Sequence, residues 1–151
     1  MRRAALALGI VLAWAATAGA AARASEYTNP ADHTRVRVTA LHVGQGNHFL
    51  RPRLGDVCLA AHVVIRNLGR TVNPGGSGVI EVETARGQAY WQSGACPVRT
   101  PYLARQPLAP GVTVAGWVTI ELPRTSGRTY LGWTDGGRLN PPARLATIPL
   151  P

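Results

Sequence analysis

Apolar and polar side chains alternate with a period of two residues along much of the chain after residue 34, and this pattern restricts those segments to strands. The clearest case is the segment 57–67, where one face holds Val57, Leu59, Ala61, Val63 and Ile65. Successive side chains of a strand point to opposite faces, so the pattern predicts a strand with that face in a core. The other face is mostly small and apolar, which predicts a central strand partly covered on both sides.

Six further segments carry strand signals, and no 3.6-residue periodicity follows residue 24. Turns rich in Gly, Pro and Asn separate these segments. Their ranges are 35–40, 80–84, 88–92, 112–122, 129–134 and 144–150. About seven short strands in a chain of this length predict one all-β domain, an antiparallel β-sandwich, with a partly closed barrel as the alternative.

The first 24 residues have the composition of an export signal. Two Arg residues precede an uncharged Ala- and Leu-rich stretch (4–22), and small residues flank the bond before Ser25. This order predicts a helical secretory signal peptide, with cleavage after Ala24 or, alternatively, after Ala20. A retained membrane anchor is disfavoured, because a spanning helix needs roughly 20 predominantly apolar residues and this stretch is barely long enough.

The predicted organisation follows from that signal. Residues 1–24 are the signal peptide, 25–34 a flexible lead-in and 35–151 a single β-sandwich domain. No Cys stands just after the hydrophobic stretch, so attachment of a lipid is not expected. We therefore expect a secreted protein, extracellular or periplasmic, with no membrane contact after cleavage.

Charge indicates the kind of partner. All 16 basic residues are Arg; three lie in 1–24, and the other 13 stand against seven acidic residues, a formal charge of +6. A basic balance favours an anionic macromolecule as partner. The Arg residues are scattered, so we expect no phosphate-tracking surface and no specific nucleic-acid binding. Either a GC-rich genome or selection for bidentate guanidinium contacts explains the exclusive use of Arg.

Cys58 and Cys96 are the two Cys residues of the chain. In an exported protein an isolated pair predicts a disulfide. Closing a loop of nearly 40 residues stabilises the fold by about 4 kcal/mol in the chain-entropy model. A reactive thiol is the alternative, but no His is adjacent to either Cys to lower a thiol pKa.

Several loose motifs resemble one bacterial family. They are Val63-Val64-Ile65-Arg66-Asn67-Leu68-Gly69, the segment 80–90 with a turn at Arg86-Gly87, Leu108-Ala109-Pro110-Gly111 leading into the strand that ends at Pro123, and Tyr130-Leu131-Gly132-Trp133. Over about residues 35–135 they resemble the telokin-like, immunoprotective extracellular domain family, whose secreted proteins and lipoproteins are mostly of unknown function. The resemblance implies an immunoglobulin-like sandwich outside the cell and carries over no catalytic residue. The missing lipid-attachment Cys and the insertion with Cys96 depart from the family pattern.

The Gly-containing turns after residue 66 have structural rather than catalytic explanations. A strand that ends in Asn67-Leu68-Gly69 is expected to leave into a turn, where Asn bonds nearby backbone. The Gly-rich segment 74–78 lacks the spacing of a nucleophile elbow and predicts a hairpin-type loop.

Catalytic and metal-binding patterns are weak. The four His residues (His33, His42, His48 and His62) form no i, i+2 pair, so surface His is the favoured interpretation over a metal site. Glu81 and Glu83 are expected on one solvated strand face, about 7 Å apart by strand rise. We predict no catalytic residue, cofactor or metal, and therefore no enzyme.

Trp117 is the candidate of most interest, because it lies opposite the apolar stripe of its strand. An aromatic side chain on an exposed sheet face contacts sugars or proteins, whereas burial in the core or beneath the Cys96 loop is the more ordinary interpretation. Together with the nearby Arg124 and Arg128 it is the predicted partner surface.

The favoured function is a secreted, non-enzymatic β-sandwich that binds an envelope or extracellular macromolecule. The alternatives are a structural or accessory domain without a ligand and, less favoured, a metal-binding periplasmic protein; the oligomeric state is not predicted.

Overall fold

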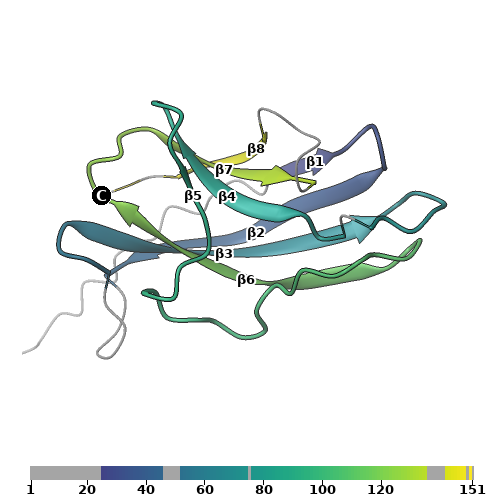
Figure 1. Cartoon of the computed structure of the whole chain (residues 1–151), viewed down its shortest axis with the longest axis horizontal. Coiled ribbons are helices and arrows are strands. Elements are labelled where there is room, and N and C mark those ends of the chain that lie inside the picture. Colours follow the sequence, from purple (N-terminus) through teal and green to yellow (C-terminus); the bar gives the residue numbers. More distant parts are fainter. Residues whose placement is uncertain (1–24, 46–51, 75, 136–141, 149, 151) are drawn as a thin grey trace, which may run out of the picture.

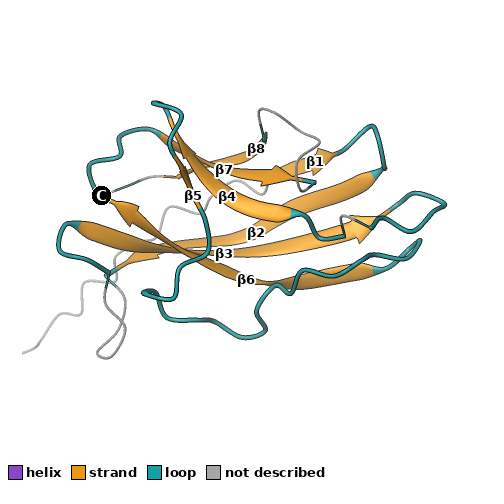
Figure 2. Ribbon diagram, viewed as in Figure 1, coloured by secondary structure: helices purple, strands orange, loops and turns teal. Residues whose placement is uncertain are grey.

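Two antiparallel four-stranded sheets make up the fold, as seen in a computed structural model that describes residues 25–45, 52–74, 76–135, 142–148 and 150. Every regular element of this described part is a strand (Figures 1 and 2). The strands are β1 (Glu26–Thr28), β2 (Thr34–Gly44), β3 (Asp56–Asn67), β4 (Val79–Thr84), β5 (Ala89–Tyr90), β6 (Thr113–Pro123), β7 (Thr129–Thr134) and β8 (Ala143–Ile148). The predicted all-β sandwich is confirmed; the predicted signal peptide lies outside the described residues.

The first sheet, which we call the β3 sheet, has the order β1-β2-β3-β6. Figure 1 shows its three long strands side by side, with β3 between β2 and β6. The predicted central position of this strand is confirmed. Its predicted inner face, from Val57 to Ile65, is buried, while His62 and Val64 on the outer face are half-buried.

Strand β2 is longer than the alternation predicts, because a β-bulge interrupts the pattern. The register with β3 shifts between Val38 and Ala40, so that Thr39 is the extra residue. A bulge reverses which residues face the core. Before it Val36 and Val38 point inward; after it Leu41 takes that role and His42 moves to the outer face, opposite Ala60.

The second sheet, the β4 sheet, has the order β5-β4-β7-β8. Strand β7 pairs with β4 along its whole length and with β8 on its other side. Trp133 on β7 points inward and is fully buried, and its Nε1–H donates a 2.8 Å hydrogen bond to the Ser77 carbonyl. The neighbouring Gly78 has a φ of +65°, and a Cβ there would collide with the Thr134 carbonyl and the Trp133 ring, so this position requires glycine.

One apolar core fills the space between the sheets. Its buried members come from β2, β3, β4, β6, β7 and β8, together with Leu108 from the long connection before β6. They are Val36, Val38, Val57, Leu59, Ala61, Val63, Ile65, Ile80, Val82, Leu108, Val118, Ile120, Leu122, Leu131, Trp133, Leu145 and Ile148.

The turn after β3 is built as its sequence predicts. The Gly69 N–H donates a 2.8 Å hydrogen bond to Oδ1 of Asn67. The same fully buried side chain donates through Nδ2 to the carbonyls of Leu108 and Thr71. Asn67 therefore ties the end of β3 to the connection before β6.

The segment 25–34, predicted as a flexible lead-in, differs from the prediction. Residues Glu26–Thr28 form β1 and pair with residues 35–37 of β2. The prediction is wrong for these residues because a three-residue strand is too short to display an alternating pattern. A turn closed by hydrogen bonds between Asn29 and Thr34 and between His33 and Asn29 joins the two strands.

The long connection from residue 91 to 112 runs beside the free edge of β6 (Figure 1). Gln92 bridges to Ile120, and Tyr102 bridges to Trp117. Between these two points Cys96 forms the predicted disulfide with Cys58, with 5.6 Å between the Cα atoms. The connection thus covers an edge strand that would otherwise offer unpaired backbone groups, and it holds residues 96–101 against the outer face of the β3 sheet.

Candidate binding face

Trp117 lies on the outer face of the β3 sheet, where the alternation places it. It pairs in register with His62 of β3 and is half-buried. The His62 ring stands edge-on at 5.1 Å between centroids, and the His42 ring of β2 lies 5.6 Å away. The bulge in β2 brings His42 to this face, because it changes which residues point outward. Trp117 is therefore outside the core, at the centre of an aromatic and imidazole cluster.

Arg99 completes this cluster from the long connection. Its guanidinium carbon lies 4.8 Å from the centroid of the Trp117 ring, which is cation–π geometry. The segment that carries Arg99 is held at both ends. Cys96 is bonded to β3, and the Pro101 carbonyl accepts a 2.8 Å hydrogen bond from the Trp117 N–H. An exposed side chain is thus kept over one ring by the disulfide and by backbone pairing.

His62 is oriented by the bulge residue. The Thr39 hydroxyl and Nδ1 of His62 share a hydrogen bond of 2.6 Å, and the same hydroxyl lies 3.2 Å from the His62 carbonyl oxygen. Neither contact involves a carboxylate. The imidazole is therefore positioned beside Trp117 by a neutral group.

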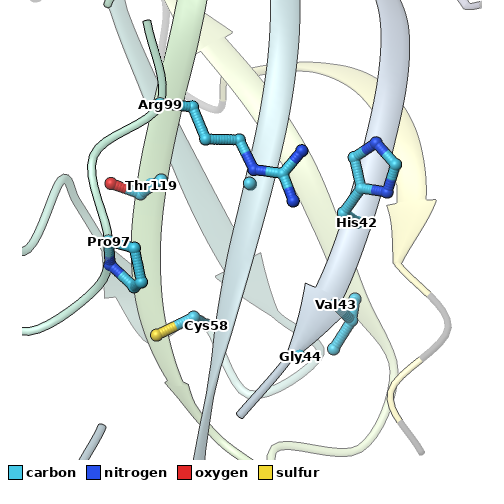
Figure 3. A pocket seen from close by; sticks show the side chains of 8 residues that line it. His42, Val43, Gly44, Cys58, Pro97, Arg99 and Thr119 are labelled. Carbon is cyan, nitrogen blue, oxygen red and sulfur yellow. The ribbon is translucent and has the colours of Figure 1, made fainter. Parts of the chain in front are cut away.

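A hollow of about 370 Å³ opens beside the cluster. Figure 3 shows the Arg99 side chain reaching across β3 toward His42, with Thr119 and Pro97 beside β6 and Cys58 lower on β3. Among the described residues, none that lines the hollow is acidic. The lining residues are His42, Val43, Gly44, Cys58, Ala60, Pro97, Arg99 and Thr119.

The nearest acid along the same face of β6 is Glu121, two positions after Thr119. Its carboxylate oxygens are engaged elsewhere. Oε1 accepts a 2.7 Å hydrogen bond from the Arg53 N–H, and Oε2 lies 3.4 Å from the Ser93 hydroxyl. Glu121 thus accepts a hydrogen bond at each oxygen and is not one of the residues that line the hollow.

The remaining cations of this face extend the positive charge toward the other end of β2. Arg37 and Arg66 are exposed on the outer face, whereas Arg35 pairs with Glu26 at 3.3 Å. Within the described ranges, no carboxylate forms an ion pair with Arg37, Arg66 or Arg99. Together with Trp117, His42 and His62 these three Arg residues define what we call the basic face.

The predicted site residues separate into two groups. Trp117 belongs to the basic face, but Arg124 and Arg128 lie exposed in the turn between β6 and β7. Arg124 follows Trp117 by seven positions, about 23 Å at the rise of a strand. The structure therefore does not bring the Arg loop to Trp117.

Sequence reasoning missed Arg99 and undervalued two of the His residues. The pairing of His62 with Trp117 follows from the antiparallel register, which the order of the strands alone does not give. The position of Arg99 depends on the path of a loop without periodicity. Its one signal was its place three residues after a bonded Cys.

Metal binding finds no support in the described residues. They contain no group of three or more His, Cys, Asp or Glu side chains arranged to hold an ion. His33 lies in the turn before β2, and His48 lies outside the described part of the chain. The described residues also include no helix of the length and apolarity needed to cross a membrane.

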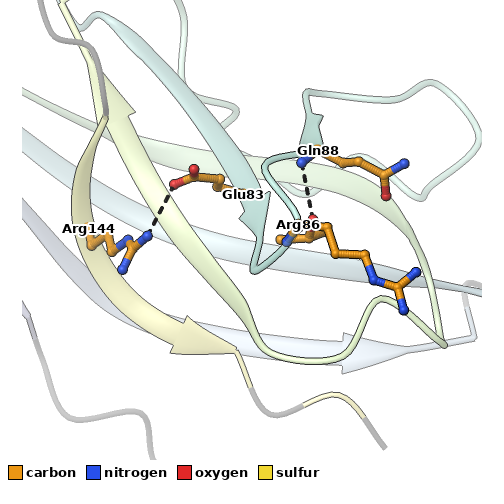
Figure 4. Close-up of polar contacts among 5 residues, drawn as sticks. Glu83, Arg86, Gln88 and Arg144 are labelled. Atoms are coloured by element: carbon orange, nitrogen blue, oxygen red, sulfur yellow. Dashed lines mark hydrogen bonds and ion pairs between the residues drawn. The ribbon is translucent and has the colours of Figure 1, made fainter.

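Glu81 and Glu83 share the outer face of the β4 sheet, as the alternation predicts. Glu81 accepts a 2.9 Å hydrogen bond from Nε1 of Trp91. Glu83 pairs with Arg144 at 3.8 Å (Figure 4), and the guanidinium of Arg144 lies 4.2 Å from the centroid of the Tyr130 ring. Each of the two acids is therefore engaged by a neighbouring side chain.

Comparison with known proteins shows a shared fold. No protein-family model matches the chain, and no curated protein sequence matches it. The structure is similar to that of a "putative lipoprotein (ycdA)" from Bacillus subtilis subsp. subtilis str. 168, with a TM-score of 0.61 at 12% sequence identity. That match covers 83% of this chain and 38% of the other, so this chain spans well under half the length of the B. subtilis protein. A conserved hypothetical protein from Bacillus anthracis matches with a TM-score of 0.48 at 12% identity, over 74% of this chain and 90% of that one.

Proposed function

We propose that this chain is a secreted, non-enzymatic binding protein and that its basic face binds an anionic macromolecule at the cell envelope or outside the cell. The observation that carries the proposal is the cluster around Trp117. Arg99 and two imidazoles surround one half-buried ring, and no described carboxylate pairs with the guanidinium. An unneutralised cationic surface of this kind attracts anions and holds them through charge-assisted hydrogen bonds.

Export is part of the same proposal. The Cys58–Cys96 disulfide is typical of proteins that mature in an oxidising compartment, outside the cytoplasm. The predicted signal peptide supplies the route, with release rather than lipid attachment as the expected outcome. We also propose that the chain is a bacterial telokin-like domain. This proposal rests on the motifs between residues 35 and 135, and it is consistent with such a location and with a β-sandwich.

A binding role suits the basic face better than catalysis does. A His that acts as a general base is usually oriented by a carboxylate, but His62 shares its Nδ1 hydrogen bond with Thr39. Trp117 and Arg99 are groups that hold a ligand rather than transfer protons. We therefore assign the cluster to recognition.

The proposal is tested by binding to a polyanion of defined chemistry. We would immobilise the purified protein and measure binding of inorganic polyphosphate and of dextran sulfate by biolayer interferometry, with neutral dextran as the blank. Arg99→Ala is expected to weaken polyanion binding by about tenfold, because one charge-assisted contact is worth roughly 1.5–3 kcal/mol before compensation by its neighbours.

Arg128→Ala is the matched control, since it removes an equally exposed guanidinium from the turn that lies away from Trp117. It is expected to change binding less than twofold. Equal losses in both variants would mean that net charge, rather than the basic face, holds the polymer. If the wild-type protein binds neither polyanion, the alternative of a structural or accessory domain without a ligand replaces this proposal.

A further inference from the structure

We propose that the hollow between Arg99 and His42 is a subsite for one phosphate group, presented by a polymer whose phosphodiesters are separated by sugar or polyol units. This inference rests on the proposed function and specifies the ligand of the same face. The hollow, about 370 Å³, has room for one such group with part of its neighbouring unit. Its walls include one permanent cation and one imidazole and, among the described residues, no acid.

The arrangement of the donors suits a phosphodiester within a polymer. Arg99 reaches across β3 from the β6 side, and His42 stands on β2 at the opposite wall (Figure 3). The two anionic oxygens of a phosphodiester can face the two walls while its two ester oxygens continue the polymer on either side, whereas a carboxylate is attached through a single carbon. The guanidinium fork also matches phosphate oxygens in a bidentate way.

The cations of the basic face form two groups rather than a continuous row. Arg37 and Arg66 are neighbours at one end of β2, and Arg37 precedes His42 by five positions, about 17 Å along the strand. Phosphates of one DNA strand follow each other about every 3.4 Å along the helix axis, so most phosphates of a nucleic acid laid along this face would lie between the two groups. Proteins that bind single strands without sequence preference also offer open aromatic rings for base stacking. Here the Trp117 ring is already covered by Arg99.

The disulfide holds this subsite together. Cys58 lines the floor, and its bond to Cys96 fixes the segment that carries Arg99 three residues later. The guanidinium lies on Trp117, which limits its rotamers. A phosphate in the hollow therefore meets a donor that is already oriented, and less side-chain entropy is lost on binding.

The first experiment follows individual side chains of the purified protein by NMR. Glycerophosphoglycerol is the probe, because it presents a single phosphodiester between two polyol units. We expect saturable shifts of the Arg99 Nε–Hε and His42 ring signals, with a dissociation constant in the millimolar range. Arg99→Ala should weaken binding at least tenfold, while Arg128→Ala leaves it within twofold. The backbone amide spectrum of Arg99→Ala shows whether the variant retains its fold.

Substitution of His42 tests the second wall. His42→Gln should weaken binding of the probe at least threefold, because it removes the ring that stands opposite Arg99 across the hollow. His33→Asn is the matched control, because His33 lies in the turn before β2 and outside the basic face; it should leave binding within twofold. Equal losses in the two variants would contradict the assignment of His42 to the subsite.

The ligand class is tested with two competitors. Acetate is expected to displace the probe at least fivefold less well than inorganic phosphate, and single-stranded DNA should bind more weakly than the phosphodiester probe per phosphate. Equal competition by acetate, tighter binding of DNA, or shifts that persist in Arg99→Ala would each overturn the assignment. If polyphosphate is still captured while the probe does not shift the Arg99 and His42 signals, this subsite is wrong and the proposed function stands. If polyphosphate is not captured and the probe causes no shifts, both the subsite and the proposed function are wrong.

Discussion

The two outer faces of the sandwich arise from the same alternating pattern, but their charges are used differently. On the β4 sheet, Arg144 lies on Tyr130 and pairs with Glu83, so its positive charge is balanced within the face (Figure 4). On the β3 sheet, Arg99 lies on Trp117 in the same kind of stacked contact, with no described carboxylate beside it.

The difference shows why a cation stacked on an aromatic ring is not sufficient to mark a site. Beside Arg144, Glu83 already occupies the place that an anionic ligand would take. Beside Arg99 there is a hollow instead. The acid nearest to it along β6, Glu121, accepts hydrogen bonds from the Arg53 backbone N–H and the Ser93 hydroxyl. The β3 sheet therefore presents the face that remains open to an external anion.

Removal of the disulfide should have the largest effect on the stability of the protein and on binding by the basic face. In the double variant Cys58→Ser/Cys96→Ser, the free energy of unfolding is expected to fall by about 4 kcal/mol, because the unfolded chain regains the freedom of a 38-residue separation. Polyphosphate binding should fall as well, since Arg99 is no longer held over Trp117. Urea unfolding measures the first effect and interferometry the second.

A folded double variant that still binds polyphosphate as tightly as the wild type would show that the disulfide does not organise the basic face. Reduction of the wild-type protein with dithiothreitol provides an independent version of the same test, because it breaks the bond without a substitution.

Trp117→Ala should have the next largest effect. The side chain is half-buried, so we expect a loss of about 1–2 kcal/mol in the free energy of unfolding, below the 3–5 kcal/mol typical of a fully buried Trp. Binding should weaken at least tenfold, because Arg99 loses the ring that orients it. Trp91→Ala is the control: Trp91 is 57% exposed, contacts Glu81 and lies outside the basic face, so its loss should leave binding within twofold. The reverse ranking of the two variants in binding would move the site to the Trp91 side.

The salt dependence of polyphosphate binding should distinguish the two faces, with a smaller effect than the substitution of Trp117. If two cations of the basic face contact the polymer, raising NaCl from 50 to 200 mM should weaken polyphosphate binding roughly tenfold through counterion release. Arg99→Ala should lower the slope of log K against log salt by about one contact, and Arg144→Ala should leave it unchanged. A slope altered equally by both substitutions would place the polymer on both faces.

The sequence predicts the strands of both faces because alternation is a local property. The inner stripes of β3 and β6 and the outward position of Trp117 all follow from spacing alone. The Cys58–Cys96 disulfide follows from composition, since the sequence contains two Cys residues and they can pair only with each other. What decides the composition of the basic face is non-local: the bulge at Thr39 turns His42 outward, and the path of an aperiodic loop brings Arg99 over the ring.

The same limit explains the separation of Trp117 from Arg124 and Arg128. Those residues are close in sequence, but an extended strand between them converts seven positions into about 23 Å. Proximity in sequence predicts proximity in space within a tight turn and fails along a strand. His62 shows the converse, because it is distant in sequence from Trp117 and directly opposite it in the sheet.

Neutralising the acid of the β4 sheet should produce the smallest effect. The side chains of Glu83 and Arg144 are 20% and 56% exposed and their closest atoms are 3.8 Å apart, so Glu83→Gln should cost about 0.5 kcal/mol or less in the free energy of unfolding. A double-mutant cycle with Arg144→Gln measures this coupling.

The single substitution Glu83→Gln also leaves Arg144 stacked on Tyr130 with its paired acid removed. Arg144 then resembles Arg99, which is stacked on Trp117 without an ion pair to a described carboxylate. If a stacked and unpaired guanidinium were enough to bind polyanions, Glu83→Gln would gain a second binding site. We expect no such gain, because the described imidazoles, those of His33, His42 and His62, all lie on the β3 sheet or in the turn before β2. Unchanged stoichiometry of polyphosphate binding would show that an imidazole opposite the guanidinium distinguishes the two faces.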